Sequence, residues 1–125
     1  MNWKIEYIEK QNFVKIVTEG DFTVSDHEAM IEDITSQKFW KPGMDAFFDN
    51  RKLEFNETTI ELMKKVSENH KRHEKQISNG KAAILMKSLE DYLRGRQFEL
   101  LTSHQASAKM NIFMDEAEAL KWLTS

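Results

Sequence analysis

Signals for helix starts alternate with short apolar runs along this chain, and this alternation constrains the fold more than any other feature. A Ser or Thr followed three residues later by an acid occurs at Ser25 with Glu28, Thr58 with Glu61, and Ser88 with Asp91. In such a capping box the two side chains satisfy free backbone N–H groups at the start of a helix. Asp115 is a further cap, placed before a last apolar-periodic segment. These positions predict the starts of four helices.

Five segments before and between these helix starts have the pattern of strands. They are residues 3–8, 13–18, 44–48, 82–86 and 109–114. The first alternates apolar and polar residues, which indicates a half-buried strand, and the second pairs with it as a hairpin. Residues 82–86 are a continuous apolar run, typical of a strand covered on both faces. Asn79 and Gly80 precede this run, and Gly80 suits the left-handed position that ends a helix.

The predicted element order is β-β-α-β-α-β-α-β-α. Strands that alternate with helices pair in parallel through right-handed crossovers, and the opening hairpin adds one antiparallel strand. A chain of 125 residues with one Pro and four Gly has the length of one domain and no linker-like stretch. We therefore predict a single α/β domain over residues 1–125 with a mostly parallel, five-stranded sheet.

Composition excludes several classes of function. Eighteen Lys and Arg against 21 Asp and Glu give a net charge of −3, which argues against a nucleic-acid binder. The absence of cysteine excludes disulfides, thiolate catalysis and Cys-ligated metals. No apolar run approaches the length of a transmembrane segment, and the first residues lack a signal-peptide core, so we expect a cytoplasmic protein. The chain has no P-loop or G-x-G-x-x-G sequence, and we expect no cofactor.

Four stretches make the chain resemble the small SpoIIAA-like family, also described as STAS/SEC14-domain proteins. They are residues 20–23 with Asp26, residues 48–51, residues 92–99 and residues 112–123. The resemblance implies the STAS fold of the bacterial anti-sigma-factor antagonist SpoIIAA, a (βα) superhelix. It also implies a regulatory module rather than an enzyme.

STAS regulators carry a phosphorylatable Ser in an Asp-Ser-Ser-Gly-like turn at the start of the second helix. The matching residues 56–59 are Asn-Glu-Thr-Thr, without that Asp, either Ser or the Gly. The resemblance offers Thr58 or Thr59 as the acceptor, and a phosphate at a helix N-terminus would be favourable. The residues themselves favour helix capping without phosphorylation.

Polar residues gather where the predicted strands end. Ligands of open parallel sheets bind beyond the carboxyl ends of the strands, where helix N-termini favour anions. The candidate binding edge consists of Asp21, Thr23, Asp49, Arg51, Asn56, Thr58, Thr59, Ser88 and Arg96. An enzyme would need Asp49, Arg51 and Thr58 to converge. Because no nucleophile–base–acid pattern accompanies them, we predict no enzymatic activity.

The first two predicted helices carry opposite charge. Residues 19–34 contain six acids and no Lys or Arg, whereas residues 64–75 contain five bases and two acids. We predict that a protein partner docks on the second helix and the loop before it, and we interpret the basic residues as the docking face. This docking face consists of Lys64, Lys65, Lys71 and Arg72. The alternative is an ordinary solvated helix surface.

Three aromatic residues, Phe22, Trp40 and Phe55, fall in predicted loops or at element ends. Apolar residues there predict a pocket mouth or an interface. The SEC14 side of the resemblance implies a carrier or sensor of an apolar, lipid-like ligand, which we place second to a docking module. A homodimer through the exposed edge of the first hairpin, near Trp3, is a further alternative.

Two histidines, His70 and His73, lie three residues apart and so on one side of the second predicted helix. A metal site needs more ligands, and the H-E-x-x-H spacing is absent, so we expect no metal and predict that these side chains cover core. His27 and His104 have no partner near them in the sequence.

Overall fold

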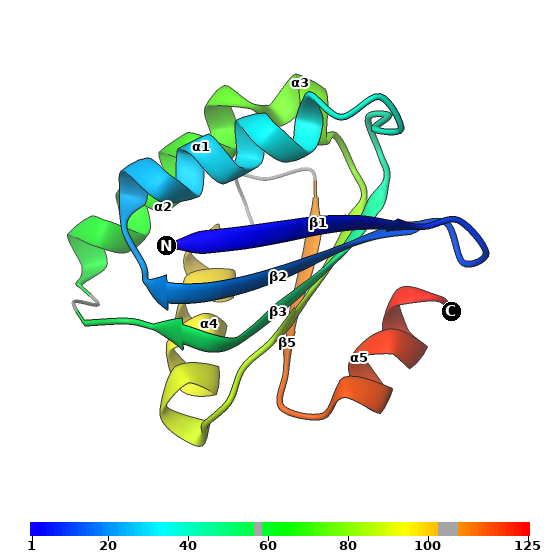
Figure 1. Ribbon diagram of the computed structural model, residues 1–125. Helices are drawn as coiled ribbons and strands as arrows, with labels where there is room; N and C mark the ends of the chain where they lie inside the picture. Colours follow the sequence, from blue (N-terminus) through cyan, green and yellow to red (C-terminus); the bar gives the residue numbers. More distant parts are fainter. Residues whose placement is uncertain (57–58, 103–107) are drawn as a thin grey trace.

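The computed structural model describes residues 1–56, 59–102 and 108–125. Within them the elements are β1 (Asn2–Ile8), β2 (Phe13–Asp21), α1 (Val24–Thr35), β3 (Asp45–Glu54), α2 (Ile60–Arg72), α3 (Glu74–Ile77), β4 (Lys81–Leu85), α4 (Leu89–Thr102), β5 (Lys109–Phe113) and α5 (Glu116–Leu123) (Figure 1). They form a single α/β domain with a five-stranded sheet, as predicted. No helix in the described ranges is both long and apolar enough to cross a membrane.

The strands lie in the sheet in the same order as in the chain, from β1 to β5. β1 runs antiparallel to β2, and β2–β3, β3–β4 and β4–β5 are parallel pairs. The sheet is therefore mixed, not the mostly parallel sheet that the sequence predicted. The element order also differs by α3, because the backbone of His73 leaves the helical conformation (φ −107°, ψ 17°) and a separate turn of helix follows.

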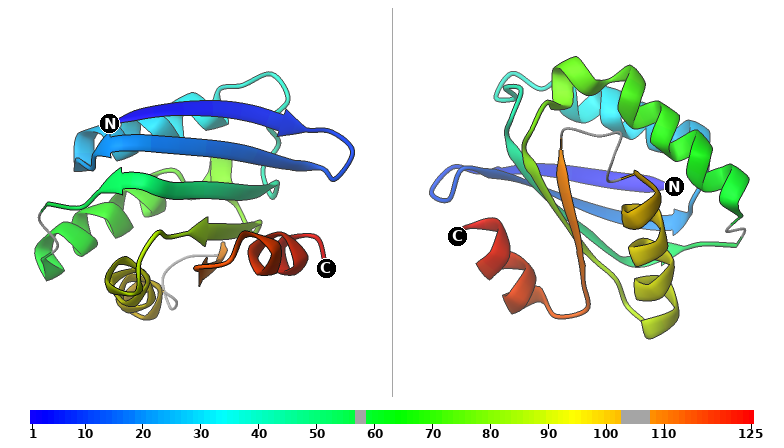
Figure 2. Two further views of the ribbon diagram at one scale, coloured as in Figure 1. Left: turned by 60° about the horizontal axis from the view of Figure 1, so that its bottom comes forward. Right: turned by 180° about the vertical axis from the view of Figure 1, so that it is seen from behind.

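Alternate residues of each strand enter two different cores. On one face, Phe13 and Phe47 pack with Ala119 and Leu123 of α5. On the other face, Val14, Ile16 and Ala46 pack with Met30 and Ile34 of α1. α4 lies on this second face, and β5 lies between α4 and α5 in both views of Figure 2.

The first two helices begin at different residues from those predicted. Thr23 caps α1, since its hydroxyl accepts from the backbone N–H of Asp26 at 3.1 Å, and Ser25 lies inside the helix. The apolar face of α1 lies toward the sheet, where Met30 and Ile34 pack. Thr59 caps α2, and Thr58 of the predicted capping box lies outside the described residues.

The later caps agree with the prediction. The hydroxyl of Ser88 accepts from the backbone N–H of Asp91 at 3.2 Å at the start of α4. The carboxylate of Asp115 accepts from the backbone N–H of Ala117 at 3.1 Å at the start of α5. Local hydrogen bonding by short polar side chains therefore sets these two helix starts.

Gly80 has a different role from the predicted left-handed cap. Ser78 takes the left-handed conformation instead, with φ 59°. Gly80 is needed for a close approach, because a Cβ built there would lie 2.2 Å from the backbone oxygen of Met44. The backbone before β3 and the start of β4 can thus pass each other only where a side chain is missing.

We expect Gly80→Ala to destabilise the fold by about 1–3 kcal/mol, since the backbone must move to admit the methyl group. Asn79→Ala, at the exposed neighbouring position, should change the free energy of unfolding by less than about 0.5 kcal/mol. Urea denaturation of both variants measures the difference. Equal stabilities would contradict the close backbone approach.

Candidate functional site

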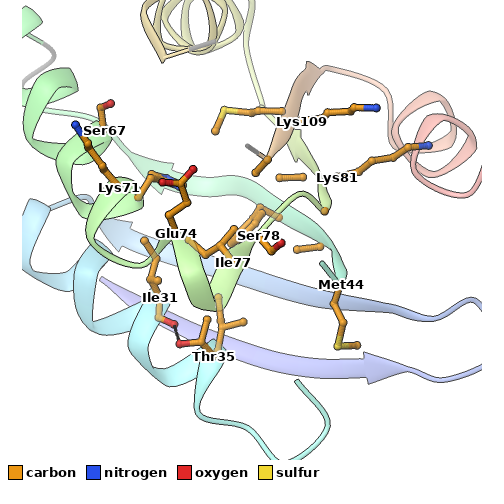
Figure 3. Close-up of a pocket in the computed structure, with 18 of the residues that line it drawn as sticks. Ile31, Thr35, Met44, Ser67, Lys71, Glu74, Ile77, Ser78, Lys81 and Lys109 are labelled. Atoms are coloured by element: carbon orange, nitrogen blue, oxygen red, sulfur yellow. Dashed lines mark hydrogen bonds between the residues drawn. The ribbon is translucent and has the colours of Figure 1, made fainter. Parts of the chain in front are cut away.

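A pocket of about 340 Å³ lies between the sheet and the helices of the α1 face. We call it the main pocket. Its walls are mainly apolar and include Ile31 of α1, Ile77 of α3 and Trp40, Phe48 and Phe98. Figure 3 shows Ile31, Ile77 and Met44 around this space. A volume of this size is at the lower end of the range for small-molecule sites.

The main pocket exists because the middle of the sheet carries small side chains. Ala46 of β3 pairs with Ala82 of β4, and both line the pocket. α1 covers the β2 side of this face, and α4 packs on β5, where Gly95 lies over Ile112. α2 packs against α1. The space above the small side chains of Ala46 and Ala82 is therefore part of the pocket.

A second pocket, of about 130 Å³, lies beside the main pocket, toward the carboxyl ends of β2 and β3. We call it the inner pocket. The residues that line both pockets are Phe48, His70, Ala82, Phe98 and Met110. Because the two pockets share these walls, they lie next to each other, and these five side chains form the junction between them.

A row of five rings, each tilted against the next, lies along the two pockets. The ring centroids of Phe55 and Phe22 are 5.3 Å apart, and those of Phe22 and His27 are 5.7 Å apart. His70 follows at 5.1 Å from His27, and Phe98 at 6.1 Å from His70. Ring contacts therefore connect Phe22, Phe55 and His27 of α1 with His70 of α2 and Phe98 of α4. Aromatic rings at these distances favour tilted packing.

Asn69 joins α2 to α1 beneath this row. Its side chain is 1% exposed, and its amide nitrogen donates to the backbone oxygen of Val24 at 3.2 Å. The same nitrogen lies 3.3 Å from Nδ1 of His27, so His27 accepts at Nδ1 and carries its proton at Nε2. The amide oxygen of Asn69 accepts from Arg72, which also pairs with Glu28 of α1.

Burial keeps two of these imidazoles neutral. Desolvation lowers the pKa of His27 well below its usual value, and the nearby His70 and His73 lower it further. Desolvation, with a smaller contribution from His73, lowers the pKa of His70 to about 4. Both rings are therefore uncharged at neutral pH.

Stability should fall as the pH decreases from 7 toward 4. The folded-state pKa of His70 lies below its unfolded value of about 6.5, so the unfolded chain takes up the proton first. We expect a loss of about 2 kcal/mol between pH 7 and pH 5 through His70 alone. Urea denaturation at the two pH values measures it, and His70→Phe should show a smaller loss. A loss of the same size in the variant would contradict the neutral, buried state of His70.

Among its described residues, the candidate binding edge contains two separate hydrogen-bonded pairs. Asp49 and Arg51 form a bidentate pair at 2.8 and 2.9 Å, which lowers the pKa of Asp49, and Arg51 is 4.0 Å from Glu116 of α5. A separate pair forms where Asn56 donates to Asp21 at 2.8 Å.

The remaining edge residues are engaged locally. Thr23, Thr59 and Ser88 cap helices. Arg96 pairs with Glu99 at 3.2 Å. Since Thr58 lies outside the described residues, its predicted convergence with Asp49 and Arg51 stays a prediction.

The basic docking face is exposed, and part of it serves the fold. Arg72 pairs with Glu28, and Lys65 lies 3.9 Å from Glu61. The acidic α1 and the basic α2 therefore attract each other across their own packing contact. In the described parts of the chain, Lys64 and Lys71 have no ion pair.

The three predicted pocket-mouth residues each line one of the two pockets. Trp40 lines the main pocket, and Phe22 and Phe55 line the inner pocket. That a ligand passes them on entry stays a prediction. Sequence reasoning treated His27 as a lone residue and did not single out Asn69. The signal for His27 was present, since it precedes Met30, Ile31 and Ile34 at helical spacing on the buried face of α1.

The histidines are arranged for packing. His73 is bonded through Nδ1 to the backbone oxygen of Asn69 at 2.9 Å, and its Nε2 lies 3.6 Å from Glu32. Among the described residues, no three His, Asp or Glu side chains gather in a way that would hold a metal ion. His104 lies outside the described residues.

The fold has a counterpart among solved structures. No protein-family model matches the chain, and no curated protein matches it. A similar crystal structure is that of an uncharacterized protein of the DUF3478 family with a SpoIIAA-like fold, from Shewanella loihica PV-4. The identity is 18%, the TM-score is 0.64, and the match covers 98% of this chain and 92% of that one. The chain therefore has a SpoIIAA-like fold, which confirms the fold that the sequence resemblance implied.

Proposed function

We propose that this protein is a non-enzymatic binding module that holds a small apolar ligand in the main pocket. The observation that carries the proposal is the mainly apolar pocket of about 340 Å³ between the sheet and α1, α2 and α4. Core-sized apolar side chains normally fill such a space, because protein interiors pack to high density. A ligand would fill it here.

This proposal reverses the order that the sequence favoured, in which protein docking came before ligand binding. A large cavity takes a sizeable share of the core in a chain of 125 residues. The two separate cores explain how the fold can hold one. Phe13 and Phe47 pack with α5 on the opposite face, so the sheet is anchored independently of the pocket.

Naphthalene is a suitable probe, since it is apolar and small enough for the main pocket. Spectra of protein labelled at the methionine methyl groups should show shifts at Met44 and Met110, which line the pocket. Met114 is 48% exposed and lines neither pocket, so its signal should stay in place. Shifts confined to Met114, or no saturable shift at all, would contradict the proposal.

We expect Ala82→Leu to weaken naphthalene binding at least tenfold, since its added methyl groups enter the junction of the two pockets. Ala117→Leu makes the same change at an exposed site on α5, across the sheet, and should bind like the wild type. The same methyl spectra give both affinities. Ala82→Val replaces Ala82→Leu if the larger side chain disturbs the fold.

A second candidate function is protein docking through α2, in a STAS-like regulatory role. The observation in its favour is the exposed face that joins Ile60, 66% exposed, to Lys64 and Lys71. These residues recur at helical spacing on one side of α2. The face would suit an acidic partner surface.

Charge reversal at Lys64 and Lys65 should abolish capture of an acidic partner and leave naphthalene binding unchanged within about twofold, since neither residue lines a pocket. Lys71 is kept, because it lines the main pocket. Arg72 is kept, because its pair with Glu28 supports the packing of α1 on α2. Capture by the reversed variant at the wild-type level would remove α2 as the docking face.

A further inference from the structure

Three histidines, His27, His70 and His73, lie close together. Among the described residues, His70 is the one of the three whose ring nitrogens have no hydrogen-bond partner. Nδ1 of His27 accepts from Asn69, and Nδ1 of His73 lies 2.9 Å from a backbone oxygen. His70 instead contacts its neighbours through ring faces, at 5.1 Å from His27 and 6.1 Å from Phe98. It is also the polar ring at the junction of the two pockets.

A polar group in such surroundings is costly without a partner. His70 is half-buried beside the apolar side chains of both pockets, and desolvation is the main cause of its low pKa. A neutral imidazole offers one N–H donor and one acceptor nitrogen. An oxygen atom of a ligand in the main pocket would supply the missing partner.

We propose that His70 is the polar recognition group of the pocket, and that it binds an uncharged hydroxyl or carbonyl oxygen on a small aromatic ligand. The inference rests on the proposed function and adds the chemical class of the ligand. His70 fixes the orientation of the ligand, while the apolar walls supply most of the binding energy, as is common in small-molecule sites.

The walls favour an aromatic body for the ligand. Trp40, Phe48 and Phe98 line the main pocket together with His70. A planar aromatic ligand can pack against these rings in an offset or edge-to-face arrangement. The pocket volume of about 340 Å³ admits a fused two-ring system.

The charges around His70 favour an uncharged head group. The charged residues that line the two pockets are Lys71, Glu74, Lys81, Glu99 and Lys109 in the main pocket, and Asp91 and Arg94 in the inner pocket. Lys81 donates to the backbone oxygens of Trp122 and Ser125 at 3.2 and 3.0 Å, and Figure 3 shows Lys71, Lys81 and Lys109 directed away from the pocket. Arg94 pairs with Glu90 at 2.7 Å.

A ligand carboxylate would therefore need His70 itself as the cation. Burial and the neighbouring His73 oppose that charge, since they lower the pKa of His70 to about 4. Beyond His73, the ring of His27 lies 5.1 Å from the ring of His70, and Lys71 and Glu74 line the main pocket with it. Arg72 is already paired with Glu28.

Three probes with one ring system separate these possibilities: naphthalene, 2-naphthol and 2-naphthoate. They are titrated at pH 7 into the wild-type protein, His70→Phe and His73→Phe, and the methyl signal of Met110 reports binding. In His70→Phe we expect the Kd of 2-naphthol to rise about two- to tenfold relative to that of naphthalene, the effect of one neutral hydrogen bond. His73 lines neither pocket, so His73→Phe should keep the wild-type ratio.

A readout on the wild-type protein makes the test independent of how well the variants fold. With nitrogen-labelled histidine, 2-naphthol should shift a ring-nitrogen signal of His70 more than naphthalene does. The ring nitrogens of His27 should move less, because Asn69 already binds Nδ1.

Each failure has its own meaning. If naphthalene binds but His70→Phe affects 2-naphthol and naphthalene equally, His70 is not the recognition group and the inference is overturned. If 2-naphthoate binds more tightly than 2-naphthol, the uncharged head group is overturned. If naphthalene itself does not bind at Met44 and Met110, the proposed function fails first.

Discussion

The packing of α2 on α1 determines whether this fold has an interior pocket. Asn69 is almost completely buried, and its single amide group binds the backbone of Val24, the ring of His27 and the side chain of Arg72. A buried polar network of this kind holds only when each member has its partner. Because α2 is anchored on α1, it can pass over Ala46 and Ala82 at the centre of the sheet while the pocket beneath it stays open.

This arrangement places stability and binding on opposite faces of one sheet. The α5 face is filled by large side chains such as Phe13 and Phe47, whereas the α1 face has Ala46 and Ala82 at its centre. A dense core tolerates little change in volume. The separation therefore allows the pocket side to differ in shape while the other side keeps the sheet together.

The fold was accessible from the sequence because its signals are local. Ser88 and Asp115 cap the helices that they were predicted to cap, and the strand patterns each lie within a few residues. The site was less accessible because it depends on distant pairs. The meeting of His27 with His70, and of Ala46 with Ala82, is decided by strand register and helix packing. Phe22, Trp40 and Phe55 were still predicted near a pocket, since large apolar residues at element ends need a partner surface.

The strand order has a consequence for how the protein is made. Each strand pairs with the strand that precedes it in the chain, so a growing polypeptide adds every new strand to the free edge of a sheet that already exists. Insertion between paired strands is never needed, and sequential assembly during synthesis is possible. Phe13 and Phe47, however, gain their cover when α5 arrives. Their face of the nascent sheet stays apolar and uncovered until Leu123 has left the ribosome, and this interval is when the chain most needs protection from aggregation.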